Sequence, residues 1–195
     1  QGLRQNLRTA MELLAKAGYE IRDGKMVHSE SGDPLAFEIL LFQKSFERVV
    51  LPFKNNLGRL GIDVTVRLVD SSQYIQRLRE FDFDMITQVF GQSDSPGNEQ
   101  REYWHSSTVD AKGSRNYMGV SDPVIDELVN MVIQAPNREE LVYRVRALDR
   151  VLLHHYYVIP HWHLRSDRVA YWNHLQRPAE TPKNGIDLDN WWAKP

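Results

Sequence analysis

The sequence predicts an α/β protein built on a mostly parallel β-sheet with helices on both faces. Three segments carry this prediction: residues 35–42 are apolar, residues 62–68 alternate between apolar and polar side chains, and residues 83–90 are apolar on both faces. Helical patterns and short connections separate them, which is typical of parallel strand–helix–strand units. A strand that is apolar on both faces lies inside a sheet, so we expect residues 83–90 to form a central strand.

The first element is expected to be a helix over residues 5–17. Its apolar side chains recur at the spacing of one helical face, and Gly18 follows where a left-handed cap belongs; the apolar residues are Leu3, Leu7, Met11 and Leu14. Turn residues at 23–24 and 31–34 bracket residues 25–28. This pattern predicts a small hairpin that leads into the strand 35–42.

Two helices are expected between the three strands. Ser45 is placed to cap the first, which carries Pro52 as a kink and ends at Gly61. Asp70 and Gln73 resemble a capping box that opens a short second helix.

Regularity breaks down over residues 91–119, apart from one helical turn expected at residues 99–104. A loop of this length usually binds or covers something. Asp122 and Asn137 then begin two amphipathic helices, the first of them stopped by Pro136, and strand-like segments follow at residues 156–163 and 168–172. No linker interrupts the chain, so we expect residues 1–195 to form a single domain.

Composition excludes several classes of protein. The chain has 195 residues, of which 42% are hydrophobic, and its 24 basic and 26 acidic residues give a net charge of -2. A surface that neutralises nucleic-acid phosphates is strongly basic, so we expect no nucleic-acid partner. The longest apolar stretch, at residues 35–42, is too short for a membrane span. The N-terminus has neither an initiator Met nor the pattern of a signal peptide, so we expect a fragment or a processed product.

Candidate catalytic groups are few. The absence of cysteine excludes disulfides, thiol nucleophiles and Cys-ligated zinc, and it is compatible with export. His161 and His163 lie on one side of a predicted strand and could chelate zinc, so a metal-dependent hydrolase is one alternative function. Asp82, Asp84 and Asp94 form a carboxylate cluster in sequence, as glycoside hydrolysis would require in space. A protein-interaction domain that uses an exposed aromatic patch is the other alternative.

The aromatic residues divide into two groups. We expect one group in the core, namely Trp162, Trp172, Trp191 and Trp192. The other group follows predicted strands or lies in the long loop, where core packing and ligand binding are equally expected; it comprises Tyr74, Phe90, Trp104 and Tyr117.

An ordered series of motifs resembles the C-terminal part of family 5 extracellular solute-binding proteins. The series covers nearly the whole chain, at residues 57–64, 74, 81–85, 104, 114–117, 121–126, 146–149 and 158–160. The resemblance implies one lobe of a periplasmic-binding-protein type II-like fold, in a two-lobed receptor that closes on its ligand. It implies the binding component of an ABC importer, located on the periplasmic or extracellular face of the cytoplasmic membrane. It implies a peptide or small-molecule ligand, and it implies two protein partners: the N-terminal lobe of the same protein and a membrane permease. It implies no enzyme activity, cofactor or metal.

The resemblance also suggests site residues. In peptide-binding relatives a Gly-Trp pair that ends a strand is followed by an Asp that grips the peptide's α-amino group; here Asp94 lies near that place and Phe90 replaces the Trp. Carboxyl ends of parallel strands meet at one edge of the sheet, so residues 43–44, 71–74 and 90–94 should meet there, with residues 115–117 nearby. The expected ligand-binding residues are Tyr74, Phe90, Gln92, Ser93, Asp94, Arg115, Asn116 and Tyr117.

Overall fold

The structure is a computed structural model that describes residues 2–162, 164, 166–182 and 185–194. Its contacts divide the chain into two units, Gln1–Tyr157 and Val158–Pro195. Nothing in either unit tests whether residues 1–195 form one domain, so that expectation stays a prediction.

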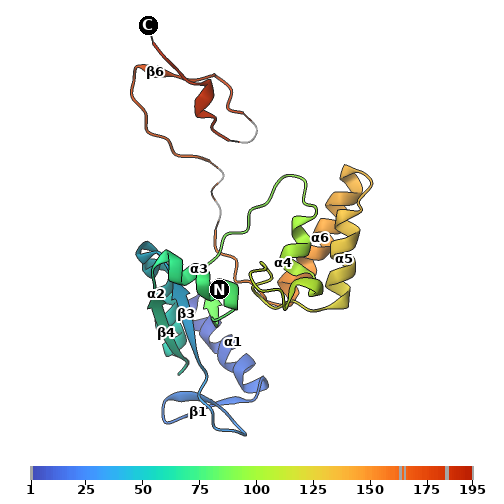
Figure 1. Cartoon of the computed structure of the whole chain (residues 1–195). Coiled ribbons are helices and arrows are strands. Elements are labelled where there is room, and N and C mark those ends of the chain that lie inside the picture. Colours follow the sequence, from blue (N-terminus) through green and yellow to red (C-terminus); the bar gives the residue numbers. More distant parts are fainter. Residues whose placement is uncertain (1, 163, 165, 183–184, 195) are drawn as a thin grey trace. The chain divides into compact units, whose positions relative to one another are not determined.

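The first unit consists of helices and short strands, with all of its strands before α4 (Figure 1). Its helices are α1 (Leu3–Lys16), α2 (Glu47–Gly58), α3 (Ser71–Glu80), α4 (Glu99–Trp104), α5 (Pro123–Ile133) and α6 (Arg138–His154), with 3-10 turns η1 (Lys44–Phe46) and η2 (Ser106–Thr108). Its strands are β1 (Tyr19–Arg22), β2 (Lys25–His28), β3 (Ala36–Leu41), β4 (Asp63–Leu68) and β5 (Met85–Ile86).

The central sheet is parallel, as predicted. Its order is β4-β3-β5, with Ile39 of β3 opposite Val66 on one side and Met85 on the other. The prediction of a long central strand at residues 83–90 is wrong, because β5 has two residues and pairs with β3 alone. The apolar side chains at the two ends of that segment serve different clusters: Phe83 packs with α3, and Phe90 packs with α4.

Helices cover both faces of the sheet, which confirms the predicted fold class. Ile39 and Leu41 of β3 are buried on the face that packs against α1 and α2. Leu40, which points the opposite way along the strand, packs against Tyr74 and Leu78 of α3. Because side chains alternate between the two faces of β3, this strand contributes to two separate hydrophobic cores.

The predicted hairpin is present as antiparallel β1 and β2, joined at residues 23–24. It is fastened to the sheet through Gly61, whose carbonyl accepts a hydrogen bond of 2.8 Å from the Met26 N–H. Gly61 has φ +78°, and a Cβ atom there would lie 2.8 Å from the Met26 nitrogen. Both the backbone conformation and the close approach require glycine.

Three of the four predicted N-terminal helix caps are confirmed. The Asp70 carboxylate accepts from two N–H groups of α3, at Ser72 and Gln73, each at 2.9 Å. Asp122 caps α5 and Asn137 caps α6 in the same way. The prediction for Ser45 is wrong, because residues 44–46 form a 3-10 turn and α2 begins without a side-chain cap.

Helices α4, α5 and α6 pack together around a second core (Figure 1). The helical turn predicted at residues 99–104 is α4, and Trp104 is one of the core side chains. The buried members are Tyr103, Trp104, Val120, Ile125, Val129, Val132 and Leu148.

The unit Val158–Pro195 differs most from the prediction. Its strands are β6 (Leu175–Gln176) and β7 (Trp192–Ala193), paired antiparallel, with the 3-10 turn η3 (Leu188–Asn190) before β7. Neither predicted strand, at residues 156–163 or 168–172, is present among the described residues, and His163 lies outside them.

The tryptophans of this unit are not the core residues we predicted. Trp162, Trp172 and Trp192 are 61%, 77% and 47% exposed, and only Trp191 is half-buried, against Tyr171. Two strands of two residues each offer no sheet face under which three indole rings could be buried.

Candidate functional site

The carboxyl ends of the three parallel strands meet around Tyr74. The ring of Phe42, directly after β3, lies 4.6 Å from the Tyr74 ring. The Tyr74 hydroxyl donates a hydrogen bond of 2.8 Å to the carbonyl of Thr87, directly after β5. After β4, Asp70 caps the helix α3 that carries Tyr74. The Tyr74 side chain thus contacts the chain directly after β3 and β5, and the helix that carries it begins at Asp70, just after β4.

The contacts of Tyr74 are structural. Its side chain is only 4% exposed, and burial raises the pKa of its hydroxyl to about 12, although the hydrogen bond to Thr87 acts in the opposite direction. The hydroxyl already has its acceptor and the ring is covered. The Tyr74 side chain therefore packs inside the protein and stabilises the carboxyl edge of the sheet.

The chain that leaves β5 crosses to the helical layer. The Phe90 ring stacks on Trp104 at 5.5 Å and meets Tyr103 edge-on at 5.2 Å. The side-chain oxygen of Gln92 accepts a hydrogen bond of 2.9 Å from Gln100, which is buried. We call residues 91–97 the rim loop.

Side chains of α4 and α6 hold the rim loop. The Arg138 guanidinium donates to the Asp94 carbonyl, and the Gly97 N–H donates to the Glu99 carboxylate at 2.9 Å. Burial raises the pKa of Glu99, but hydrogen bonds to its carboxylate outweigh burial and lower it. The Ser93 hydroxyl accepts from the Ser95 N–H at 3.1 Å. Residues 91–95 are nevertheless exposed, so the loop is both supported and accessible.

The segment 115–117 contains three residues with three different environments. Arg115 is exposed and donates a hydrogen bond of 3.2 Å to the Tyr103 hydroxyl. Asn116 is fully buried and exchanges two hydrogen bonds with the backbone of Val120, at 2.9 and 2.8 Å. The Tyr117 ring packs edge-on against Phe83 at 6.4 Å.

The structure therefore gathers the predicted residues into two groups. Phe90, Gln92 and Arg115 meet around α4, and Tyr74 and Tyr117 belong to the cluster beneath the edge of the sheet. The Asn116 side chain is buried and forms hydrogen bonds with the backbone N–H and carbonyl of Val120. Gln100 and Tyr103 are not among the predicted site residues. They lie three residues apart on α4, and that spacing places both on one helix face.

The other candidate groups have structural partners. Asp82 pairs with Arg77 at 2.9 Å, and the Asp84 carboxylate accepts the Glu38 N–H at 2.8 Å. The His161 ring stacks on Trp162 at 5.4 Å, and the described residues contain no cluster of three or more potential metal ligands. His163, the second member of the predicted pair, lies outside those residues.

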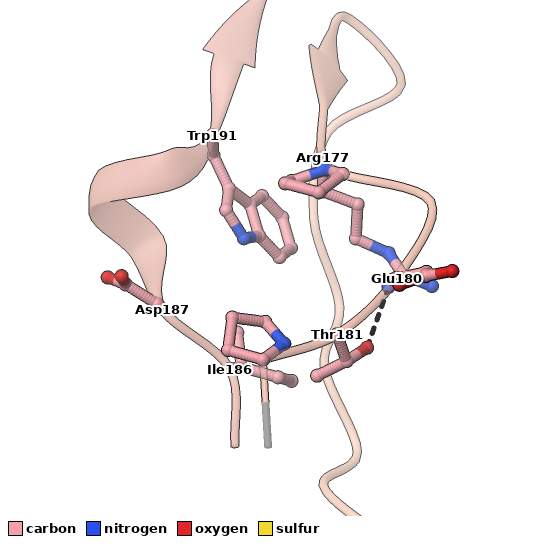
Figure 2. Close-up of a pocket in the computed structure, with 8 residues that line it drawn as sticks. Arg177, Glu180, Thr181, Ile186, Asp187 and Trp191 are labelled. Carbon is pink, nitrogen blue, oxygen red and sulfur yellow. Dashed lines mark hydrogen bonds between the residues drawn. The ribbon is translucent and has the colours of Figure 1, made fainter. Parts of the chain in front are cut away.

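Two hollows lie within the unit Val158–Pro195. The pocket in Figure 2, bordered by Trp191, Ile186 and the Arg177–Thr181 hydrogen bond, encloses about 10 Å³, room for one water molecule. The adjoining hollow is about 420 Å³ and shares Arg177 and Trp191. Neither includes a residue of the predicted ligand site.

None of the helices in the described part of the chain has the length and hydropathy of a membrane span.

Residues 2–112 match the family of bacterial extracellular solute-binding proteins, family 5 middle. The chain belongs to this family. The resemblance seen in the ordered motifs is thereby confirmed.

Relatives and solved structures extend the similarity over the whole chain. The chain is 52% identical, over all its 195 residues, to an uncharacterised protein y4wM of Sinorhizobium fredii, and covers 29% of it. It is 46% identical over 97% of its length to a probable peptide-binding protein YejA of Agrobacterium fabrum, and covers 31% of that protein. The chain thus spans about three tenths of the length of these relatives.

The fold is that of a solved oligopeptide-binding protein. The structure of AppA from Bacillus subtilis, in complex with a nonapeptide, matches 96% of this chain and 37% of its own with a TM-score of 0.74 at 19% identity. The predicted type II binding-protein fold is confirmed by this match.

Proposed function

We propose that this chain is part of the substrate-binding component of an ABC importer, which captures a peptide or peptide-like solute between two lobes. The observation that carries the proposal is the 46% identity, over 97% of the chain, to a relative named as a probable peptide-binding protein. Membership of an extracellular solute-binding family supports a site of action on the periplasmic or extracellular face of the cytoplasmic membrane, and a membrane permease as partner.

The geometry of the rim loop supports this function. A receptor for many peptides needs exposed main-chain groups and charges for the ligand termini on a supported backbone, and it needs no nucleophile or base. The exposed loop 91–95 offers such groups at the carboxyl edge of a parallel sheet, where open α/β sheets bind ligands. Asp94 is proposed to bind the ligand's ammonium group.

The exposed aromatic side chains of Val158–Pro195 support a second lobe as an intramolecular partner. Trp162, Trp172 and Trp192 would be covered by the remaining parts of a protein about three times as long as this chain. We infer that this lobe completes both the apolar contacts and the ligand site, and that the complete protein has no enzymatic activity.

The test uses the full-length protein and an equimolar mixture of tripeptides to hexapeptides. Native mass spectrometry should show capture of peptides, and D94N should weaken binding of a captured peptide about ten-fold or more, because a charge-assisted hydrogen bond is lost. D63N is the matched control, since Asp63 is an exposed carboxylate at the opposite end of β4. A full-length protein that captures no peptide would contradict the proposal. Stoichiometric zinc, found by elemental analysis, would contradict it and favour the hydrolase alternative.

A further inference from the structure

We propose that Arg115 is the anchor for a carboxylate group of the ligand, held in place by Tyr103. This inference rests on the proposed function and adds the chemical group that one residue recognises. It follows from how the guanidinium is seated and from which of its donors are already used.

Tyr103 seats the guanidinium of Arg115 in two ways. The guanidinium carbon lies 5.9 Å from the centre of the Tyr103 ring, and one of its N–H groups donates to the Tyr103 hydroxyl at 3.2 Å. A cation over an aromatic face is attracted to the ring, and the hydroxyl contact fixes its orientation. Both contacts act on one planar group, so Arg115 is oriented although it is exposed.

Tyr103 is itself tied to the rim loop. Its side chain is 3% exposed, its ring meets Phe90 edge-on at 5.2 Å, and its hydroxyl donates to the Gly91 carbonyl at 3.3 Å. The phenol thus accepts from Arg115 and donates to the first residue of the loop. Arg115 is thereby attached to the loop on which Asp94 lies.

The remaining donors of Arg115 have no carboxylate partner among the described residues. Arg115 takes part in none of the ion pairs found there, whereas Arg67 and Arg77 both pair with Glu38. Glu102 acts on Arg115 only through its charge. A guanidinium has five N–H donors in a rigid fork that matches a carboxylate, so an oriented fork with most donors available suits a carboxylate ligand.

Two sources of that carboxylate must be distinguished: the C-terminus of a peptide and an acidic side chain. The probes are four tripeptides, Ala-Glu-Ala and Ala-Gln-Ala, each with a free or an amidated C-terminus. Calorimetry on the full-length protein compares wild type, R115Q and the control R59Q, which removes an exposed arginine directly after α2, on the connection that leads to the start of β4.

The expected result is that removing one of the two carboxylates weakens wild-type binding about ten-fold or more. The same removal should have no effect in R115Q, and R59Q should behave as wild type. If amidation of the C-terminus weakens binding to the wild type but not to R115Q, the peptide C-terminus is the ligand of Arg115. If replacement of Glu by Gln weakens binding to the wild type but not to R115Q, the acidic side chain is the ligand.

Two results would overturn the inference alone. One is that R115Q weakens all four peptides equally, which indicates a structural role, and the other is that R115Q weakens none. Failure of all four peptides to bind the wild-type protein would instead overturn the proposed peptide ligand together with this inference.

Discussion

Replacing Tyr74 by Phe tests whether one hydroxyl holds the carboxyl edge of the sheet together. The change keeps the ring that packs on Phe42 and removes only the 2.8 Å hydrogen bond to the Thr87 carbonyl. A typical intramolecular hydrogen bond contributes about 1 kcal/mol. We therefore expect Y74F to lower the free energy of unfolding by about 1 kcal/mol at about pH 8.

The pKa of Tyr74 adds a second, pH-dependent prediction. In the folded protein it is raised to about 12, chiefly by burial, against about 10 in an unfolded chain. The stabilisation linked to this shift is complete below about pH 10 and is lost as the pH rises through about 12. At about pH 11 the wild type has lost about 1.4 kcal/mol at most from this one group, and Y74F has lost none of it. The stability difference between the two should therefore close near about pH 11.

Urea unfolding of both proteins at about pH 8, 10 and 11, followed by tryptophan fluorescence, measures the difference directly. All other titrating groups are shared, so they cancel in the comparison. A stability difference that stays constant or widens with pH would refute the claim that the buried hydroxyl stabilises the fold in its protonated form. No difference at any pH would refute the structural role of the hydrogen bond.

Three further predictions concern other parts of the chain. The Asp126 carboxylate accepts hydrogen bonds from both the N–H and the hydroxyl of Ser106. Burial raises the pKa of Asp126, but these hydrogen bonds outweigh burial and lower the pKa below its usual value. The ionised carboxylate therefore stabilises the fold above about pH 4, and this stabilisation is lost as the pH falls. Acid unfolding monitored by circular dichroism should be less pH-dependent in D126N than in the wild type, and equal slopes would contradict this. G61A should lower the free energy of unfolding in urea by about 2 kcal/mol or more, because a Cβ at position 61 would lie 2.8 Å from the Met26 nitrogen and residue 61 has a positive φ. The control G58A, where a Cβ would meet open space, should not destabilise the fold. Under the proposed function, the isolated chain should bind a given peptide at least ten-fold more weakly in calorimetry than the full-length protein does, because closure between the two proposed lobes would supply much of the buried area. Equal affinity would argue against a two-lobed site.

The features that depend on neighbours along the chain could be predicted from the amino-acid pattern alone. Asp70, Asp122 and Asn137 cap their helices because a cap bonds to N–H groups two or three residues ahead. The hairpin turn at residues 23–24 is local in the same sense. The parallel sheet could also be predicted, because short connections through helices leave few other topologies.

Packing between distant segments sets which apolar segments are buried and which polar groups have hydrogen-bond partners inside the protein. The apolar run 83–90 forms a two-residue edge strand because its two ends pack in different clusters, and no periodicity records that division. Trp172 is exposed because its unit provides no face to cover it. Asn116 and Arg115 are adjacent in sequence, yet one is buried against Val120 and the other rests on Tyr103. Their different roles depend on contacts with residues brought close by folding, and those contacts are set by packing in three dimensions.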